Sequence, residues 1–253
     1  AVLERLDEPK ELFAYWRSRF GAGTLPKPIK RGLADAMTRM TTEYAAMKYD
    51  GSGADVRLGD VIELVRPTPQ APWQADLFAY LLDRRHHPSD VRVSFDRLPT
   101  IRARRALETM PTEDRRAWLG RQAYIQSAMQ AAGVTWEWLS GWLPGGMDAQ
   151  AWEAAIPVMG HMALIRNLRN FDEAGISDDA ARYVVAQISN PDVVARGMQF
   201  PYRYWAAHKA SSGSLRWGRA LSAALDTSTD NIPALRGRTL VLVDTSASMN
   251  NAL

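Results

Sequence analysis

Almost every stretch before Leu235 places its apolar residues at the three- and four-residue spacing of an α-helix, and none alternates as a strand would. Leu33, Ala36, Met37 and Met40, for example, fall on one face of a helix. Glycines and prolines interrupt the pattern at short intervals, so the helices come in pairs with short breaks. No exact sequence period is visible, but the pairing is typical of helical-repeat proteins. The sequence therefore predicts a mostly α-helical array.

The expected helices can be placed from this spacing and from capping residues. Asp148 and Pro201 each mark a helix start, and Pro157 is expected to split or kink the helix that Asp148 begins. Helices are expected at residues 12–20, 26–40, 56–65, 74–82, 96–109, 112–132, 135–142, 148–163, 177–188 and 215–225, with one more after Pro201.

The segment at residues 239–249 departs from the helical pattern. Its continuous apolar run, Leu240 to Val243, predicts a strand buried on both faces of a parallel sheet. The run is followed by Asp244, Ser246 and Ser248 at alternate positions, where open α/β sheets place their ligand sites. A carboxylate and two hydroxyls at this spacing suit Mg²⁺ or another hard divalent cation, which prefers oxygen ligands.

This segment resembles the opening of a von Willebrand factor A domain, whose metal site begins with Asp-x-Ser-x-Ser. We therefore expect two parts, a helical module over residues 1–232 and the incomplete start of an α/β A-type domain over residues 233–253. The resemblance implies that the remaining metal ligands come from later loops. We accordingly expect an incomplete site and weak or no Mg²⁺ binding.

Composition excludes several classes of protein. The chain has 253 residues, 46% of them hydrophobic, which is enough to bury a core. With no cysteine, it has neither disulfides nor thiolate metal sites, and a reducing compartment, the cytoplasm, is expected. No run approaches the roughly 20 apolar residues of a membrane helix. The four histidines are scattered and no nucleophile–base pair stands out, so we expect no enzyme.

Three stretches resemble the Ro autoantigen family and its helical TROVE module: residues 152–170 with their ALIRNL core, residues 25–36 (LPKPIKRGLADA), and residues 46–51 (AMKYDG). The resemblance implies a monomeric ring of HEAT-like helical pairs closed by an A domain. It also implies that the central hole takes single-stranded 3′ ends of misfolded noncoding RNA and that the outer surface binds Y RNA. Bacterial relatives work with exoribonucleases, so a role in RNA quality control or processing is expected.

The region from Val193 to Leu225 contains cations and aromatic residues and no acid. Such a mixture suits a single-stranded RNA site, because cations follow phosphates and aromatic faces stack on bases. The alternative is that the aromatics are core residues and the cations a solvated face. We expect RNA contacts from the cations, above all Arg203, Lys209 and Arg216, and a core position for most aromatics. The aromatics in question are Phe200, Tyr202, Tyr204, Trp205 and Trp217.

Other candidate RNA contacts lie in shorter stretches. Lys27, Lys30 and Arg31 occupy the start of a helix, which favours anions. Lys48 matches a lysine of the family's outer RNA-binding surface, and Arg66 stands where the family has a Ser-His pair. Arg166 and Asn167, in the signature stretch, either satisfy buried backbone groups or contact RNA. The arginines between Arg97 and Arg121 are expected to form mainly ion pairs.

Three functions remain open at this level. The first is an RNA-binding ring protein, and the second is a helical scaffold whose basic faces dock acidic proteins. The third is a metal-dependent adhesion module of the A-domain class. A preference for structured RNA with a single-stranded 3′ tail over an acidic polypeptide distinguishes the first from the second.

Overall fold

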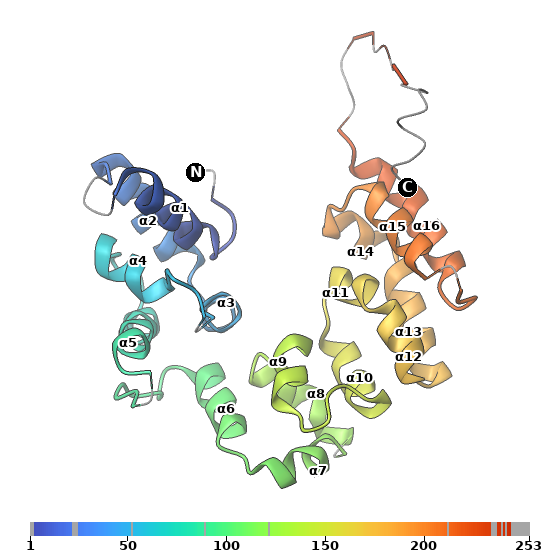
Figure 1. Cartoon of the computed structure of the whole chain (residues 1–253), viewed down its shortest axis with the longest axis horizontal. Coiled ribbons are helices and arrows are strands. Elements are labelled where there is room, and N and C mark those ends of the chain that lie inside the picture. The colour runs from blue at the N-terminus through green and yellow to red at the C-terminus, as the bar shows by residue number, and fades with distance from the viewer. Residues whose placement is uncertain are drawn as a thin grey trace. The chain divides into compact units, whose positions relative to one another are not determined.

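The computed structural model describes residues 3–21, 25–51, 53–88, 90–120, 122–211, 213–233, 237–238, 240 and 242–243. The chain divides into two compact units, Ala1–Met159 (unit 1) and Gly160–Leu253 (unit 2). Both are built from helices, as Figure 1 shows, and the described residues contain no strand. The mostly helical fold expected from the sequence is confirmed.

Unit 1 contains ten α-helices within its described residues, joined by short connections. They are α1 (Glu8–Phe20), α2 (Lys27–Met40), α3 (Glu43–Tyr49), α4 (Leu58–Val65), α5 (Pro72–His86), α6 (Pro99–Glu108), α7 (Arg115–Leu119), α8 (Gln122–Ala131), α9 (Trp136–Trp142) and α10 (Ala149–Ala155). Two 3₁₀ turns, Thr112–Asp114 and Ile156–Val158, precede α7 and follow α10.

The first core of unit 1 lies among α1, α2, α4 and α5, where Leu33, Met37, Leu58 and Leu77 are fully buried. A glycine on α4 sets the closest approach within this core. A Cβ on Gly59 would lie 2.7 Å from the carbonyl oxygen of Leu81 and 2.8 Å from the Cβ of Arg85. Only glycine lets the backbones of α4 and α5 come this close.

The second core of unit 1 is rich in tryptophan and lies among α7 to α10. Trp118 and Trp142 meet edge to face at 5.4 Å. The Trp142 indole N–H donates to the carbonyl of Leu107 at 3.0 Å, so the ring's polar atom is satisfied in the core. Trp152 on α10 is also buried and packs beside Trp136 at 5.6 Å.

Buried charges in unit 1 have structural partners. Asp50, at the end of α3, accepts a hydrogen bond from the Leu58 backbone N–H at 2.9 Å and pairs with Arg57 at 2.5 Å and Arg84 at 3.2 Å. A buried carboxylate of this kind needs such compensation. Asp50 therefore joins the AMKYDG stretch to the first turn of α4 and to the last turn of α5.

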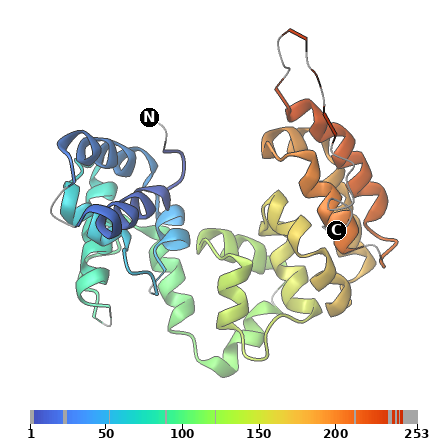
Figure 2. The same ribbon diagram turned by 45° about the horizontal axis from the view of Figure 1, so that its top comes forward.

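Unit 2 is built around its last long helix. Its helices are α11 (His161–Arg166), α12 (Leu168–Ala174), α13 (Asp178–Ser189), α14 (Pro191–Gly197), α15 (Pro201–Ala210) and α16 (Gly218–Ser228), followed by a 3₁₀ turn at Thr229–Asn231. Helix α16 packs against α13, α14 and α15 and buries Leu221 and Ala224. Figure 2 shows α15 and α16 running side by side.

Two of the expected helices are broken. The helix expected at residues 112–132 is a 3₁₀ turn, α7 and α8, with the break at Gly120, where glycine costs helix stability. The helix expected at residues 148–163 ends in a 3₁₀ turn that contains Pro157, and α11 starts afresh after Gly160. Pro157 was expected to cause this break, because proline lacks the N–H that would continue the helix.

The strand expected at Leu240 to Val243 stays a prediction. The described residues of this run, Leu240, Leu242 and Val243, belong to no strand and are largely exposed. The proposed metal ligands Asp244, Ser246 and Ser248 lie outside the described residues.

Candidate functional site

Helix α15 presents aromatic and basic side chains on one exposed face. Tyr202, Trp205 and Lys209 follow one another at steps of three and four, which places them on the same side of the helix. The Lys209 ammonium lies 5.3 Å from the centre of the Trp205 ring. Phe200, at the N-cap, stacks on Tyr202 with ring centres 6.5 Å apart. We call Phe200, Tyr202, Trp205 and Lys209 the aromatic strip.

Most of these aromatics are not core residues, contrary to the sequence-based expectation. Phe200, Tyr202 and Trp205 are 54%, 56% and 47% exposed. Only Tyr204 and Trp217 are fully buried. Helical spacing predicts which residues share a face, but whether α13, α14 or α16 covers that face is a property of the tertiary packing.

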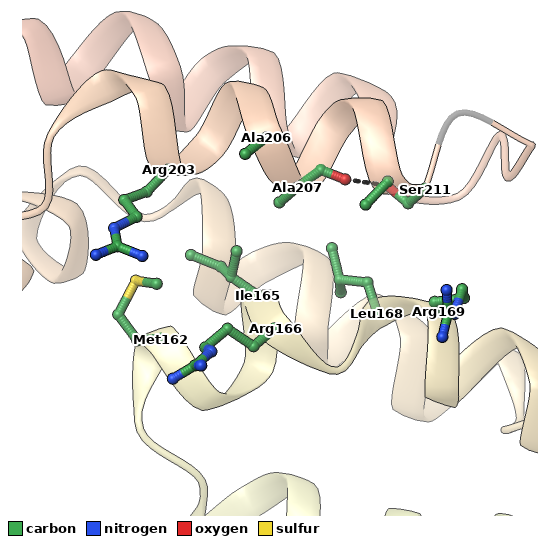
Figure 3. Close-up of a pocket in the computed structure, with 10 residues that line it drawn as sticks. Met162, Ile165, Arg166, Leu168, Arg169, Arg203, Ala206, Ala207 and Ser211 are labelled. Carbon is green, nitrogen blue, oxygen red and sulfur yellow. Dashed lines mark hydrogen bonds between the residues drawn. The ribbon is translucent and has the colours of Figure 1, made fainter. Parts of the chain in front are cut away.

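A pocket of about 220 Å³ lies beside the aromatic strip, between α11, α12 and α15 (Figure 3). Its middle is apolar, with Ile165 and Leu168 on one side and Ala206 and Ala207 on the other. Arg203, Met162 and Arg166 lie toward one end, and Arg169 and Ser211 toward the other. The pocket thus combines an apolar wall with three guanidinium groups.

The three arginines differ in their pairing. Arg169 forms an ion pair with Glu173 one turn further along α12, at 3.2 Å. Arg166 and Arg203 have no ion pair with any carboxylate among the described residues. Arg203 instead lies over the ring of Tyr202, 5.0 Å from its centre, and so joins the pocket to the aromatic strip. The positive charge at the Arg166–Arg203 end is therefore uncompensated by the described part of the chain.

Arg216 and Asn167 have structural partners. Arg216 pairs with Asp178 at 2.6 Å and donates to the carbonyl of Ile176 at 3.2 Å, which anchors the start of α13. Asn167 is 2% exposed, and its amide donates to the carbonyl of Ala163 at 2.8 Å. These contacts favour the backbone-satisfying alternative for Asn167, while its neighbour Arg166 is exposed and faces the pocket.

The candidates in unit 1 lie on separate helices. Lys27 and Arg31 are exposed on the first turns of α2, with Lys30 half-buried between them, and no acidic residue lies in that first turn. Lys48 is exposed on α3 and contacts the rings of Tyr44 and Tyr49 at 5.9 Å and 5.3 Å. The exposed Arg66 is the C-cap of α4, in the left-handed conformation with φ of 48°.

In the described part of the basic segment from Arg97 to Arg121, three arginines donate to backbone carbonyls and two form ion pairs. Arg104 is buried, donates to the carbonyl of Ala132 at 2.9 Å and stacks on Trp138 at 4.3 Å. Arg115 donates to the carbonyl of Trp142 at 2.8 Å, and Arg116 to that of Pro144. Ion pairs of the expected kind join Arg97 to Asp76 at 3.2 Å and Arg116 to Asp148 at 2.9 Å.

His161 and Tyr204 form a hydrogen-bonded pair inside unit 2. The His161 Nε2 lies 2.9 Å from the Tyr204 hydroxyl. Burial lowers the pKa of His161 from its ordinary value, and a contact with the Gln187 backbone opposes this shift only in part. The imidazole is therefore held neutral at physiological pH, in a position that helps fix α15 on α11.

No group of three or more metal-ligating side chains occurs among the described residues. His86 and His87 lie at the end of α5, each beside one carboxylate, Glu63 and Asp83 respectively. In the part of the chain that the structure describes, no helix is both long and apolar enough to cross a lipid bilayer.

The sequence did not single out Arg169, and it did not indicate that Arg166 and Arg203 line the same pocket. Arg169 follows Arg166 by three residues, a spacing that would have suggested a common face. No local pattern indicates that Arg203, on α15, lines the same pocket as Arg166, because that follows from how α15 packs on α11.

Comparison with known proteins agrees with this architecture. Residues 134–236, which include the pocket and the aromatic strip, match the model of the TROVE domain. No curated protein matches the chain significantly. The crystal structure of the Ro (RSR) protein of Deinococcus radiodurans matches over 90% of this chain, with 18% sequence identity and a TM-score of 0.61. The chain spans about half of that protein, 47% of its length. Residues 134–236 are thus similar to a TROVE domain, within a helical chain that has the fold of part of a Ro protein.

Proposed function

We propose that this chain binds RNA, and that unit 2 holds the single-stranded part of it. The observation that carries this proposal is the aromatic strip beside uncompensated arginines. Phe200, Tyr202 and Trp205 are large aromatic side chains exposed to water on and next to α15, where exposure of apolar surface is unfavourable. Cations contact two of them, Tyr202 and Trp205. Exposed aromatic faces next to cations are the components of single-strand binding sites.

The energetics favour RNA over an acidic protein as the ligand. An acidic polypeptide would use the cations but would leave the flat faces of Phe200, Tyr202 and Trp205 without specific partners. A single strand uses both, because each base stacked on an aromatic ring contributes about 1–3 kcal/mol. Similarity to the TROVE domain, and the resemblance to the Ro family, support the same ligand class.

We propose further that unit 1 contacts a structured part of the RNA, of the Y-RNA type. Lys48 and Arg66 are exposed and have no carboxylate partner among the described residues. Lys27, Lys30 and Arg31 add a second basic site on α2, where helix donors and side-chain charges favour phosphate. Both sites are proposals that rest on exposure and on the resemblance to the Ro family.

The other expectations from the resemblance remain proposals of the same standing. They are an exoribonuclease partner, a monomeric ring, a role in RNA quality control, and an incomplete divalent-cation site at Asp244, Ser246 and Ser248 that binds Mg²⁺ weakly or not at all. A cytoplasmic location, expected from the lack of cysteine, is a proposal too. We propose no catalytic activity.

The test is fluorescence anisotropy with a hairpin RNA that has a single-stranded 3′ tail, a short single strand, a blunt duplex and polyglutamate. The double variant Lys48→Glu/Arg66→Glu should weaken binding of the hairpin and spare the single strand. Arg203→Glu/Lys209→Glu should weaken binding of the short single strand most, and it should remove the advantage of the tailed hairpin over the blunt duplex. Arg92→Glu/Arg182→Glu, whose exposed arginines already pair with Asp90 and Asp179, is the matched charge control and should change neither.

Two results would contradict the proposal. If polyglutamate competes as well as the tailed hairpin does, the chain is a protein-binding scaffold. If both double variants lose both RNAs equally, there is one binding surface and not two.

A further inference from the structure

The pocket between α11, α12 and α15 has an asymmetric distribution of charge. Arg166 and Arg203 line the same end of the pocket from opposite sides (Figure 3). Neither forms an ion pair with a carboxylate of the described residues. At the other end Arg169 is paired with Glu173, and an adjoining hollow is lined by Arg169, Asp172 and Glu173. An anion is therefore favoured at the Arg166–Arg203 end and disfavoured at the end near Asp172 and Glu173.

Between the two ends the pocket is apolar. Ile165, Leu168, Ala206 and Ala207 form its walls, and the small side chains of the two alanines leave room on the α15 side. The volume of about 220 Å³ is below the ~300–1,000 Å³ that encloses a drug-sized ligand. The apolar part of the pocket therefore has room for one compact apolar group, such as a single ring system, while an anion attached to that group would lie at the Arg166–Arg203 end.

We propose that this pocket binds one nucleoside monophosphate unit, with its phosphate between Arg166 and Arg203 and its base against Ile165 and Leu168. Guanidinium groups bind phosphate through paired, charge-assisted hydrogen bonds, which lysine does not reproduce. The same chemistry is present in a free nucleotide and in one residue of a strand. The proposal rests on the proposed RNA function in assigning the second source, a nucleotide of the bound RNA.

The position of Arg203 supports a nucleotide of the bound RNA as the ligand. Its guanidinium lines the pocket and also lies over the ring of Tyr202, 5.0 Å from the ring centre. Tyr202 in turn stacks with Phe200. A strand whose bases stack along the aromatic strip would thus meet Arg203 with its next phosphate and deliver the following base to the pocket.

The experiment titrates the full chain with adenosine 5′-monophosphate, adenosine and inorganic phosphate, followed by NMR or calorimetry. The monophosphate should bind about tenfold or more tightly than adenosine, because charged hydrogen bonds contribute about 1.5–3 kcal/mol. It should also bind more tightly than phosphate alone, because phosphate does not use the apolar walls.

Two variants test the two halves of the pocket independently. Arg166→Gln should weaken the monophosphate about tenfold and leave adenosine unchanged. Ala206→Phe, at an exposed position on the pocket wall, should fill the apolar space and weaken both the monophosphate and adenosine while sparing phosphate. Arg182→Gln is the control, and a thermal melt of each variant confirms that it is folded.

A short oligonucleotide then distinguishes the two sources. It should displace the monophosphate, and Arg166→Gln should weaken its binding. If it binds without displacing the monophosphate, the RNA assignment of the pocket is wrong.

Failure of this inference and failure of the RNA function give different results. If wild type binds the tailed hairpin but not the monophosphate, the pocket proposal is overturned and the RNA proposal stands. If the monophosphate binds in the pocket but no RNA does, the RNA proposal is overturned. Monophosphate binding that Arg166→Gln and Ala206→Phe both leave unchanged would place the nucleotide elsewhere.

Discussion

At the scale of single residues, Asn167 has a structural role in the stretch that resembles the Ro family, and its neighbour Arg166 is the ligand-binding candidate. Its buried amide bridges the carbonyl of Ala163 and the side chain of Asn170, which donates to it at 2.7 Å. We expect Asn167→Ala to destabilise the protein by about 1–3 kcal/mol, because the partly buried carbonyl of Ala163 and the side chain of Asn170 both lose their partner. RNA affinity of the folded variant should be unchanged. Urea denaturation measures the first effect, and a large loss of RNA affinity without loss of stability would contradict this assignment.

His161 gives unit 2 a pH dependence of known sign. Its pKa in the folded protein is below the unfolded value of 6.5, so the unfolded state binds the proton more readily. The stabilisation is complete above that value and is lost as the pH falls through and below it. Between about pH 7.5 and 5.5, the thermal midpoint of wild type should fall more than that of His161→Gln, which keeps a hydrogen-bonding group for Tyr204. Equal falls would show that His161 is protonated without cost.

At the scale of the elements, Trp152 anchors α10. It is buried, packs beside Trp136, and lies on a short helix whose first turn is capped by Asp148 at 2.9 Å. Truncation to alanine removes a large buried ring and leaves a cavity, so Trp152→Ala should cost about 3–5 kcal/mol. The free energy of unfolding, measured with urea, checks this. Trp73→Ala on α5, where the ring is half exposed, should cost much less.

Some capped helices could be predicted from the sequence to within a residue or two, whereas α3 after Thr42 and α14 after Asn190 were not expected. Ser177 starts α13, and its hydroxyl accepts from the Ala180 N–H at 3.3 Å, so both the residue type and its place were readable. The break at Gly120 was not, because a glycine inside a helical pattern costs only about 1 kcal/mol and tertiary packing decides whether the helix continues.

The candidate site was predictable only in part, for the same reason. The cations near Arg203 stood out because no acid accompanies them between Val193 and Leu225. That Tyr204 is buried while its neighbours Arg203 and Trp205 are exposed depends on which side of α15 packs on α11 and α16. Aromatic residues occur on both the buried and the exposed side of α15, so their spacing in the sequence does not distinguish a buried aromatic from a ligand-binding one.

At the scale of the whole molecule, the dependence of RNA affinity on salt reports how many phosphates are neutralised. Each phosphate that binds a cation releases counterions, so log affinity falls linearly with log salt concentration, by about 0.7 per contact for a single strand. If Arg203 and Lys209 each contact one phosphate, Arg203→Gln/Lys209→Gln should reduce the slope for a single strand by about 1.4, twice the single-contact value. Arg216→Gln should reduce it by less, because Arg216 is already paired with Asp178.

Aromatic stacking contributes little to this slope, so Trp205→Ala should lower affinity by a similar factor at every salt concentration. A slope that the Arg203→Gln/Lys209→Gln variant leaves unchanged would mean that the phosphates are bound elsewhere on the protein.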